Sequence, residues 1–277
     1  MIAFKPRGYI LDRSGIVLHP DQGSIEHYYH FLLGYLLPLT WFARSAREVI
    51  RIIDCGPVMN RILEETLSSC GFRWEYWDRW KPFVRVADLP RWDFFRDDPS
   101  EFSSAITSLS ARLNAAPDCP RSDCPKEENL FLLRSPEPDF YTSEGAALIK
   151  GYGSGTRKFA NVDEVQDELN AKGIRYSAYE PGGHNLKCQM ISFRSASRVF
   201  GIRGAEFSNV IWMKRDSVIH LVFENGKTTP YVPELAKFLK IKVEISVHDE
   251  TTPVIESASV EKFFQPSGWP SKSSRRR

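Results

Sequence analysis

The second half of the sequence places fixed positive charges beside a glycine-rich loop, a combination that binds phosphate groups. Arg134 follows the apolar run "LFLL", and the loop "GYGSGTRKFAN" (151–161) brings Arg157 and Lys158 to the expected start of a helix at Asn161. Backbone amides, side-chain cations and a helix N-terminus all attract a diphosphate. We interpret these residues as part of a diphosphate site; a surface loop with solvated charges is the alternative.

A second candidate stretch is "EPGGHN" (180–185), which lies between an expected strand and an expected helix. Glycine allows the backbone to come close to a ligand. Gly182, Gly183 and His184 are therefore candidates for contact with a nucleotide base or ribose. A tight turn with no ligand is the alternative.

The third stretch, "VFGIRGAEFSNVIWM" (199–213), runs from an apolar strand through a Gly-x-x-Gly turn into a helix. Arg203 and Gly204 lie at the turn, and Glu206 and Asn209 lie three residues apart at the start of the helix. Taken alone, this stretch is a strand-to-helix turn that weakly favours anions. Together the three stretches predict a nucleotide-diphosphate site, although their glycine spacing fits neither a dinucleotide-binding fingerprint nor a P-loop.

The first half contains a candidate general base. In "EHYYHF" (26–31), Glu26 and His30 are four residues apart and share one face of a helix, with His27 next to them. An imidazole beside a carboxylate can accept a proton from a hydroxyl near neutral pH. We predict His30 as the base and Glu26 as the group that orients it. A structural histidine and a His27–His30 metal pair without a third ligand are the alternatives, and the rival bases are Asp12, Asp21 and Asp78.

The aromatic stretch "WEYWDRW" (74–80) mixes rings with carboxylates. Aromatic residues at this density often belong to a core, but exposed rings beside carboxylates also bind the apolar faces of sugars. We assign Trp77 and Asp78, together with His27, to acceptor binding.

Strands and helices alternate through the second half and would position the phosphate-binding residues. After the strand "LFLLR" (130–134) a helix is expected over 161–173, with Asn161 as N-cap, Glu164 as its capping-box partner and Gly173 as the stop. Further strands are expected in "IRYSAY", "VFGI", "SVIHLVF" and "KVEISV", and further helices in "NLKCQMISFRSAS", "AEFSNVIWMK" and "VPELAKFLK". This alternation predicts right-handed βαβ units, a parallel sheet and a ligand beyond the carboxyl ends of its strands.

The first half is less regular but similar in kind. It predicts a hairpin around 12–15, a long helix in 25–46 bent near Pro38, a strand in "EVIRIIDC", a helix ending at Gly71, short strands in "FRWEYW" and "FVRVAD", and a helix near 99–113. A proline-rich linker separates the two α/β halves, and we expect a cleft between them.

Composition excludes several classes of protein. Hydrophobic residues at 42% suit a globular chain, and a formal charge of +2 argues against a nucleic-acid binder. The odd number of cysteines, 5, favours reduced thiols in a cytosol-like compartment. Cys119 and Cys124 have no evident second ligand pair, which argues against zinc. With no leader and no apolar run of transmembrane length, we expect a soluble, cytoplasmic protein whose basic tail attracts membrane surfaces weakly at most.

In this order, several blocks resemble glycosyltransferase family 61. "EHYYHFLLGYLLPL" is similar to the family's N-terminal block, an Asn-aromatic-x-His-Phe helix with an acid four residues after the histidine. "LLRSPEP" and "GTRKFANVDEV" are similar to its Arg...Arg-x-x-x-Asn-x-x-Glu segment. "QMISFRSASRVFGIRGAEFSNVIWM" is similar to its Gln-x-x-x-Phe-x-x-Ala...Gly-x-His-Gly-Ala-Gly-x-x-Asn block. The resemblance spans about Glu26 to Phe223.

Five positions depart from the family pattern. Gly34 stands where an acid is usual, His27 where asparagine is usual, and His220 where many members carry glutamate. Arg203 replaces the usual histidine and Glu206 the usual glycine. Gly34 argues against a catalytic acid at that position, and Arg203 and Glu206 suggest altered contacts with the donor.

The resemblance implies a GT-B-like architecture of two facing Rossmann-like α/β domains with a cleft between them. The acceptor side would be residues 1–115, the linker 116–128, the nucleotide-sugar-binding domain 129–265 and a disordered basic tail 266–277. The family's members transfer xylose, N-acetylglucosamine or arabinose from nucleotide sugars, with inversion and usually without a metal. We therefore expect an inverting, metal-independent transferase with no cofactor, a UDP-sugar donor (xylose first) and a glycan hydroxyl as acceptor.

In this interpretation Arg134, Arg157, Lys158 and Arg203 neutralise the pyrophosphate, and Glu206 binds a ribose or sugar hydroxyl. Asn161 and Asn209 shape the loop and helix ends, and the remaining donor contacts are Gly182, Gly183, His184 and Gly204. A non-catalytic carbohydrate-binding or scaffolding relative is the alternative function. A dinucleotide-dependent enzyme is a third, which the missing fingerprint disfavours.

Overall fold

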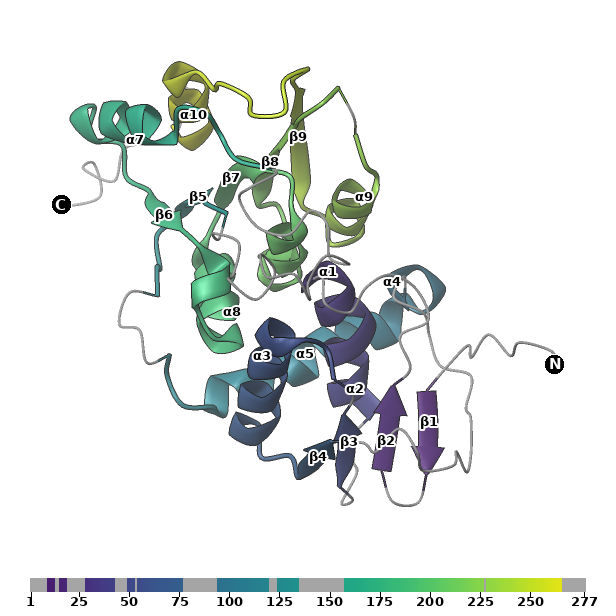
Figure 1. Cartoon of the computed structure of the whole chain (residues 1–277). Coiled ribbons are helices and arrows are strands. Elements are labelled where there is room, and N and C mark those ends of the chain that lie inside the picture. Colours follow the sequence, from purple (N-terminus) through teal and green to yellow (C-terminus); the bar gives the residue numbers. More distant parts are fainter. Residues whose placement is uncertain are drawn as a thin grey trace, which may run out of the picture. The chain divides into compact units, whose positions relative to one another are not determined.

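The computed structural model describes residues 9–12, 15–18, 28–42, 49–52, 54–76, 94–119, 124–134, 157–226 and 228–265. The chain forms two compact units (Figure 1). The first unit takes the chain up to Cys124 together with 184–193 and 205–212, and the second unit takes the rest. Two segments from the second half of the sequence therefore belong to the first unit.

The second unit is built on the predicted parallel sheet. Its strands are β5 (Asn129–Leu132), β6 (Ser177–Tyr179), β7 (Arg198–Ile202), β8 (Val218–Phe223) and β9 (Lys242–Val247). They lie in the order β6-β5-β7-β8-β9, and every neighbouring pair is parallel. The chain thus moves from β5 to one side and returns to the other side with β7. Open α/β sheets bind ligands at such a reversal, beyond the carboxyl ends of the strands.

The helices of this half mostly follow the sequence prediction. They are α7 (Val162–Ala171), the 3₁₀ helix η4 (Pro181–Gly183), α8 (Leu186–Ser195), the 3₁₀ helix η5 (Ala205–Trp212), α9 (Tyr231–Phe238) and α10 (Ser257–Phe264). The sequence predicts neither α10 nor the 3₁₀ form of η5. The Ser208 hydroxyl of η5 donates to the carbonyl of Ala205, three residues earlier. Serine and asparagine compete in this way with α-helical backbone bonds.

Helix α7 begins and ends as predicted, but its capping box is wrong. Asn161 is the N-cap residue, and Gly173 follows the helix at a φ of 67°. The Asn161 side chain makes no cap hydrogen bond. Its amide instead donates to the carbonyl of Ile255 (2.8 Å) and accepts from the N–H of Ile255 (3.0 Å), which ties the start of α7 to the segment before α10.

Aromatic rings fill the core of the second unit. Phe131 of β5 and Phe200 of β7 lie 5.7 Å apart between ring centroids, and both contact Phe159. Phe263 and Phe264 of α10 contact Phe200. Rings from the strands, the loop before α7 and the last described helix thus form one apolar cluster.

The first unit combines short strands with longer helices. Strands β1 (Tyr9–Asp12) and β2 (Gly15–Leu18) form the predicted antiparallel hairpin, and β3 (Ile50–Ile52) pairs in parallel with β4 (Trp74–Tyr76). The helices are α1 (Tyr28–Phe31), η1 (Leu32–Leu36), α2 (Leu37–Phe42), α3 (Pro57–Ser69), α4 (Phe94–Asp97) and α5 (Pro99–Ala115). The predicted strand at 83–88 and the basic tail at 266–277 lie outside the described residues.

The distortion predicted near Pro38 is a π-helical turn, η1, between α1 and α2. The N–H of Leu37 donates to the carbonyl of Leu32, five residues earlier. Proline has no N–H and cannot continue the α-helical ladder, so the wider turn falls directly before it. Thr40 then donates its hydroxyl to the carbonyls of Leu36 and Leu37, both at 3.0 Å.

Across the described ranges, no helix has both the length and the apolar character needed to cross a membrane.

Candidate active site

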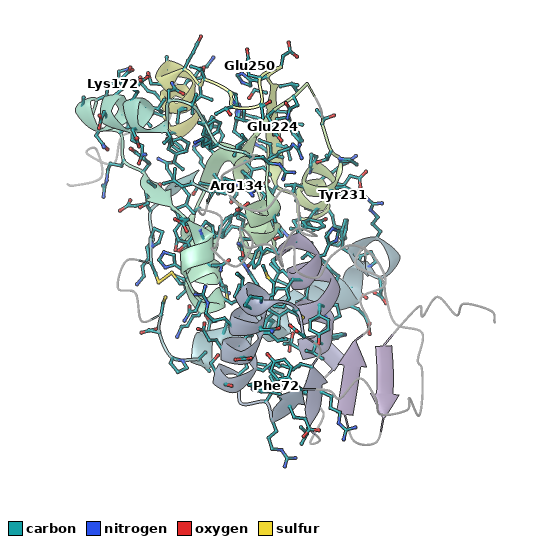
Figure 2. The ribbon with its side chains drawn as sticks, viewed as in Figure 1. Phe72, Arg134, Lys172, Glu224, Tyr231 and Glu250 are labelled. Carbon is teal, nitrogen blue, oxygen red and sulfur yellow. A yellow bond between two sulfur atoms is a disulfide. The ribbon has the colours of Figure 1, made fainter. Side chains whose placement is uncertain are left out.

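Strands β5, β7 and β8 of the second unit lead into charged residues at one edge of the sheet (Figure 2). Arg203 directly follows β7, Glu224 directly follows β8, and Arg134 lies two residues beyond β5. Because the strands are parallel, all three positions lie at the carboxyl edge. Arg134 and Arg203 flank the reversal between β5 and β7, where sheets of this order bind ligands.

Glu224 brings two of the predicted phosphate-binding arginines together. Its side chain is 1% exposed. Arg203 contacts both carboxylate oxygens, with Nε 3.0 Å from Oε2 and Nη2 2.6 Å from Oε1, while Nε of Arg157 lies 3.3 Å from Oε1. We call Arg157, Arg203 and Glu224 the Glu224 cluster. Its formal charges sum to +1, so a buried anion holds two cations in place and leaves a net positive charge.

The other predicted donor residues of the second unit differ in exposure. Lys158 is exposed, whereas Gly182, Gly183 and Gly204 are half-buried. Both bonds of the Asn161 amide go to Ile255, so this residue shapes the loop before α7. The glycines of 151–155 lie outside the described residues.

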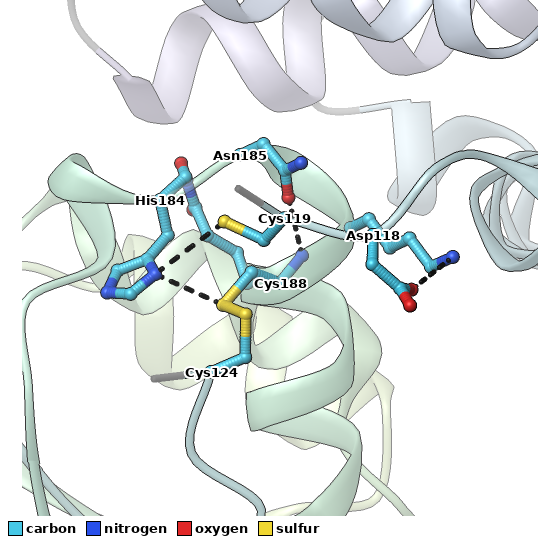
Figure 3. Close-up of a disulfide and its surroundings, with 8 residues drawn as sticks. Asp118, Cys119, Cys124, His184, Asn185 and Cys188 are labelled. Atoms are coloured by element: carbon cyan, nitrogen blue, oxygen red, sulfur yellow. Dashed lines mark hydrogen bonds and ion pairs between the residues drawn. A yellow bond between two sulfur atoms is a disulfide. The ribbon is translucent and has the colours of Figure 1, made fainter. Parts of the chain in front are cut away.

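His184, predicted as a donor contact, lies in the first unit among cysteines. The ring is 6% exposed, and its Nδ1 is 3.2 Å from Sγ of Cys188. Cys188 is joined to Cys124 by a disulfide (Figure 3). The expectation that all cysteines are reduced is therefore wrong for this pair in the structure. Two residues 64 apart in the sequence pair because α8 belongs to the same unit as the segment after α5.

A buried neutral network lies in the first unit, formed by Tyr28, Gln189, Asn209 and Trp212; we call it the Tyr28 network. The Tyr28 hydroxyl lies 2.7 Å from Oε1 of Gln189 and 2.9 Å from Oδ1 of Asn209. Asn209 donates to Oε1 of Gln189 (2.9 Å), and Nε1 of Trp212 donates to Oδ1 of Asn209 (3.1 Å). Gln189 and Asn209 are 1% and 0% exposed. The Asn209 amide is thus engaged inside the unit, between α1, α8 and η5.

The Tyr28 network fixes the helix that carries the predicted base. His30 lies two residues after Tyr28 in α1, is half-buried, and meets the ring of Tyr29 edge-on at 5.7 Å between centroids. Glu206, the predicted hydroxyl contact, is half-exposed at the start of η5 in the same unit. The structure therefore places His30, Glu206 and Asn209 in the first unit and the Glu224 cluster in the second.

Several predicted residues fall outside the described part of the chain. These are Glu26, His27, Trp77, Asp78 and the rival base Asp21, together with the side chain of Asp12.

Four residues that organise these clusters are not among the site residues predicted from the sequence: Tyr28, Gln189, Trp212 and Glu224. Glu224 has a readable signal, because it is an acid directly after the apolar strand "VIHLVF" at the ligand-binding edge of a parallel sheet. Tyr28 and Trp212 carry no such signal, since aromatic residues in apolar helices usually only fill a core.

Comparison with known proteins identifies the class of the chain. The family model described as Glycosyltransferase 61 matches residues 28–220, which is more than half of the sequence. The chain belongs to glycosyltransferase family 61, and the resemblance seen in its motifs is confirmed. A search among curated proteins gives no significant match. Family membership supports a transferase that takes a sugar from a donor and passes it to a glycan acceptor.

Proposed function

We propose that the protein is an inverting glycosyltransferase that moves a sugar from a UDP-sugar to a glycan hydroxyl by single displacement. The observation that carries this proposal is the Glu224 cluster, in which Arg157 and Arg203 share a buried carboxylate at the carboxyl edge of a parallel sheet. The departing UDP carries negative charge that develops as the glycosidic bond breaks. Pre-oriented guanidinium groups stabilise such charge, and a metal ion is not required for this role.

Within this proposal, Glu224 orients the arginines rather than contacting the donor. A carboxylate pointing at a diphosphate would repel it, but here both carboxylate oxygens are engaged by guanidinium groups. Arg134 and Lys158 add positive charge on the same half of the chain, and Gly182, Gly183 and Gly204 allow the backbone to approach the nucleotide. Glu206 would accept a hydroxyl of the ribose or the sugar.

We propose His30 as the base that removes the acceptor's proton, with Glu26 orienting it; Asp12, Asp21 and Asp78 remain rivals. The Tyr28 network supports this assignment because it anchors α1 through buried hydrogen bonds two residues before His30. A base must be held firmly within reach of the hydroxyl that it deprotonates. Acceptor contacts from His27, Trp77 and Asp78, and a GT-B arrangement with a donor domain at 129–265 and an acceptor domain at 1–115, complete the proposal.

Binding of UDP to the Arg157→Ala variant tests the donor site. Losing a charge-assisted contact typically costs about 1.5 to 3 kcal/mol, so UDP affinity by calorimetry should fall by about 10- to 100-fold. The matched control is Arg175→Ala, which removes the same charge from a side chain that is 78% exposed in the same unit. If Arg157→Ala has the same circular dichroism as the parent and binds UDP equally well, the assignment of Arg157 to the diphosphate site is wrong.

A donor panel separates the proposed transferase from its alternatives. Among UDP, GDP and CMP sugars, thermal shifts should be largest with UDP-sugars; we rank UDP-xylose first, then the N-acetylglucosamine and arabinose donors. A scaffolding relative should respond to none, and a dinucleotide-dependent enzyme only to NAD(P). Turnover of the responding donor, assayed briefly with EDTA, should persist, and complete loss at once would count against metal-independent chemistry.

A further inference from the structure

Four potential metal ligands gather in the first unit, outside the proposed sugar-transfer machinery. Cys119, Cys124, His184 and Cys188 each contribute one ligand atom, and these atoms all lie within 4.8 Å of one another. Nδ1 of His184 lies 3.2 Å from Sγ of Cys188 and 4.0 Å from Sγ of Cys119 (Figure 3). We propose that the reduced protein binds one Zn²⁺ through these four side chains, and that the ion has a structural role.

The ligand set and its spacing suit zinc. Zn²⁺ in structural sites takes four thiolate or imidazole ligands at about 2.3 Å for sulfur and about 2.0 Å for nitrogen, which places neighbouring ligand atoms about 3.5 to 3.8 Å apart around a tetrahedron. The two distances from His184 Nδ1 bracket that separation. His184 lies two residues before α8 and Cys188 lies in its first turn, while Cys119 and Cys124 come from one short segment.

In the sequence, Cys119 and Cys124 have no second pair of ligands near them. That pair is the histidine and cysteine at the start of α8, which the chain reaches only about 60 residues later. All four ligand positions are filled by protein groups, so no position is left for a substrate or an activating water. Such a closed site is structural rather than catalytic, and it leaves the proposed metal-independent transfer unaffected.

Polar contacts hold together the two segments that carry the ligands. Lys187, next to Cys188 in the sequence, lies 2.9 Å from Asp118, next to Cys119, and donates to the carbonyl of Ala116. The side chain of Asn185 accepts from the N–H of Cys188 at 2.9 Å and fixes the start of α8 (Figure 3).

The disulfide must open before zinc binds. In the structure Cys124 and Cys188 share an S–S bond. A dithiol reductant supplies two electrons and becomes a cyclic disulfide, while the protein's S–S bond breaks to give two thiols. Zn²⁺ then displaces the protons of Cys119, Cys124 and Cys188 to solvent, and His184 binds as the neutral imidazole. The disulfide uses only two of the four clustered groups, whereas the metal uses all of them.

The site would also support the Tyr28 network. The carbonyl of His184 accepts a hydrogen bond from Nε2 of Gln189 at 3.0 Å. Gln189 in turn contacts Tyr28 and Asn209. Holding His184 on a metal would therefore fix one end of the chain of hydrogen bonds that anchors α1.

The metal content of the full chain tests the proposal. Protein purified under a dithiol reductant should contain about one zinc per chain by elemental analysis, and Co²⁺ substitution should give thiolate charge-transfer and tetrahedral d–d absorption bands. Cys119→Ser should lower zinc to below about one tenth per chain and weaken both cobalt bands. Cys70→Ser, which changes a free half-buried cysteine away from the cluster, should keep full occupancy. If Cys119→Ser does not fold, His184→Gln provides the same test.

Three results would overturn the proposal. They are zinc below about one tenth per chain in the reduced parent, a Co²⁺ spectrum that Cys119→Ser leaves unchanged, and a Cys124–Cys188 disulfide that persists by mass spectrometry under reductant. None of these measurements depends on sugar transfer, so a failed metal site and a failed UDP site are told apart directly.

Discussion

The Tyr28 network of the first unit and the Glu224 cluster of the second unit are built from opposite kinds of side chain. The first consists of neutral groups, of which Gln189 and Asn209 are fully buried and bond mainly to each other and to two aromatic residues. The second pairs a buried carboxylate with two arginines that reach solvent and keeps a net positive charge. A network whose members satisfy one another can position a helix, whereas a cluster with residual charge can also attract an anionic ligand.

The largest effect on stability is expected from Asn209→Ala. The change leaves the buried Nε1 of Trp212 without its acceptor, removes one of the two hydrogen bonds to Oε1 of Gln189 and opens a cavity, so the free energy of unfolding should fall by about 2 to 4 kcal/mol. Urea unfolding of the full chain measures this. Ser103→Ala on the exposed face of α5 is the control and should change stability by less than about 0.5 kcal/mol. Equal losses in the two variants would mean that the network is not a structural anchor.

In the Glu224 cluster, Glu224→Gln tests whether the carboxylate acts by orienting the two arginines or only through its charge. It raises the local formal charge from +1 to +2, which by charge alone would strengthen UDP binding. If Glu224 positions Arg157 and Arg203, as proposed, the affinity should instead fall by about 10-fold, or about 1.4 kcal/mol. Calorimetry with UDP distinguishes the two. Glu164→Gln, on the exposed surface of α7, removes the same charge as a control, and tighter binding in Glu224→Gln would contradict the orienting role.

Tyr28→Phe should have a smaller effect, because it removes one hydroxyl and keeps the ring. The loss should be about 1 kcal/mol in the free energy of unfolding, while UDP affinity stays unchanged. Urea unfolding and calorimetry on the same preparation check both parts. A fall in UDP affinity would contradict the proposal that the Tyr28 network only anchors α1 and that the Glu224 cluster binds the nucleotide.

The smallest effect is expected at His220, a half-buried residue that belongs to neither cluster. Its ring stacks on Phe200 at 4.8 Å between centroids, and burial lowers its pKa, partly opposed by the carboxylate of Glu244. The pKa of His220 is lower in the folded chain than in the unfolded chain. The contribution of the neutral ring to the free energy of unfolding is therefore complete above about pH 6.5 and is lost as the pH falls toward the folded-state pKa. Measured by urea unfolding from pH 7 to 5, the free energy of unfolding should decline less steeply in His220→Gln than in the parent. Identical slopes would exclude His220 as a source of the pH dependence.

Local patterns predicted the strands and most helices, because their signals lie within a few residues. Helix α7 is an example, with its N-cap at Asn161 and its stop at Gly173. The use of the Asn161 side chain was not predictable, since its partner Ile255 lies 94 residues away. The 3₁₀ form of η5 was missed for a related reason, because its Asn209 bonds to another helix.

The sequence predicted those site residues that directly follow a strand and carry a charge. It did not predict contacts between residues from distant segments. Arg134 and Arg203 were found because the ends of parallel strands meet at one edge. The pairing of Arg203 with Glu224 and the gathering of Cys119 with His184 depend on the packing of distant segments, which no spacing rule supplies.

The π-helical turn at Leu32–Leu36 has a consequence for which changes of chain length the first unit tolerates. This turn contains one residue more than an α-helical turn would, and each residue of an α-helix accounts for about 100° of rotation. Deleting one residue of the turn would convert it into an ordinary α-helical turn, so Tyr28 and His30 would keep nearly their present orientation relative to α2. Inserting a further residue there would instead rotate both by about that angle and turn the tyrosine away from Gln189, so the first unit should tolerate a deletion at this point better than an insertion.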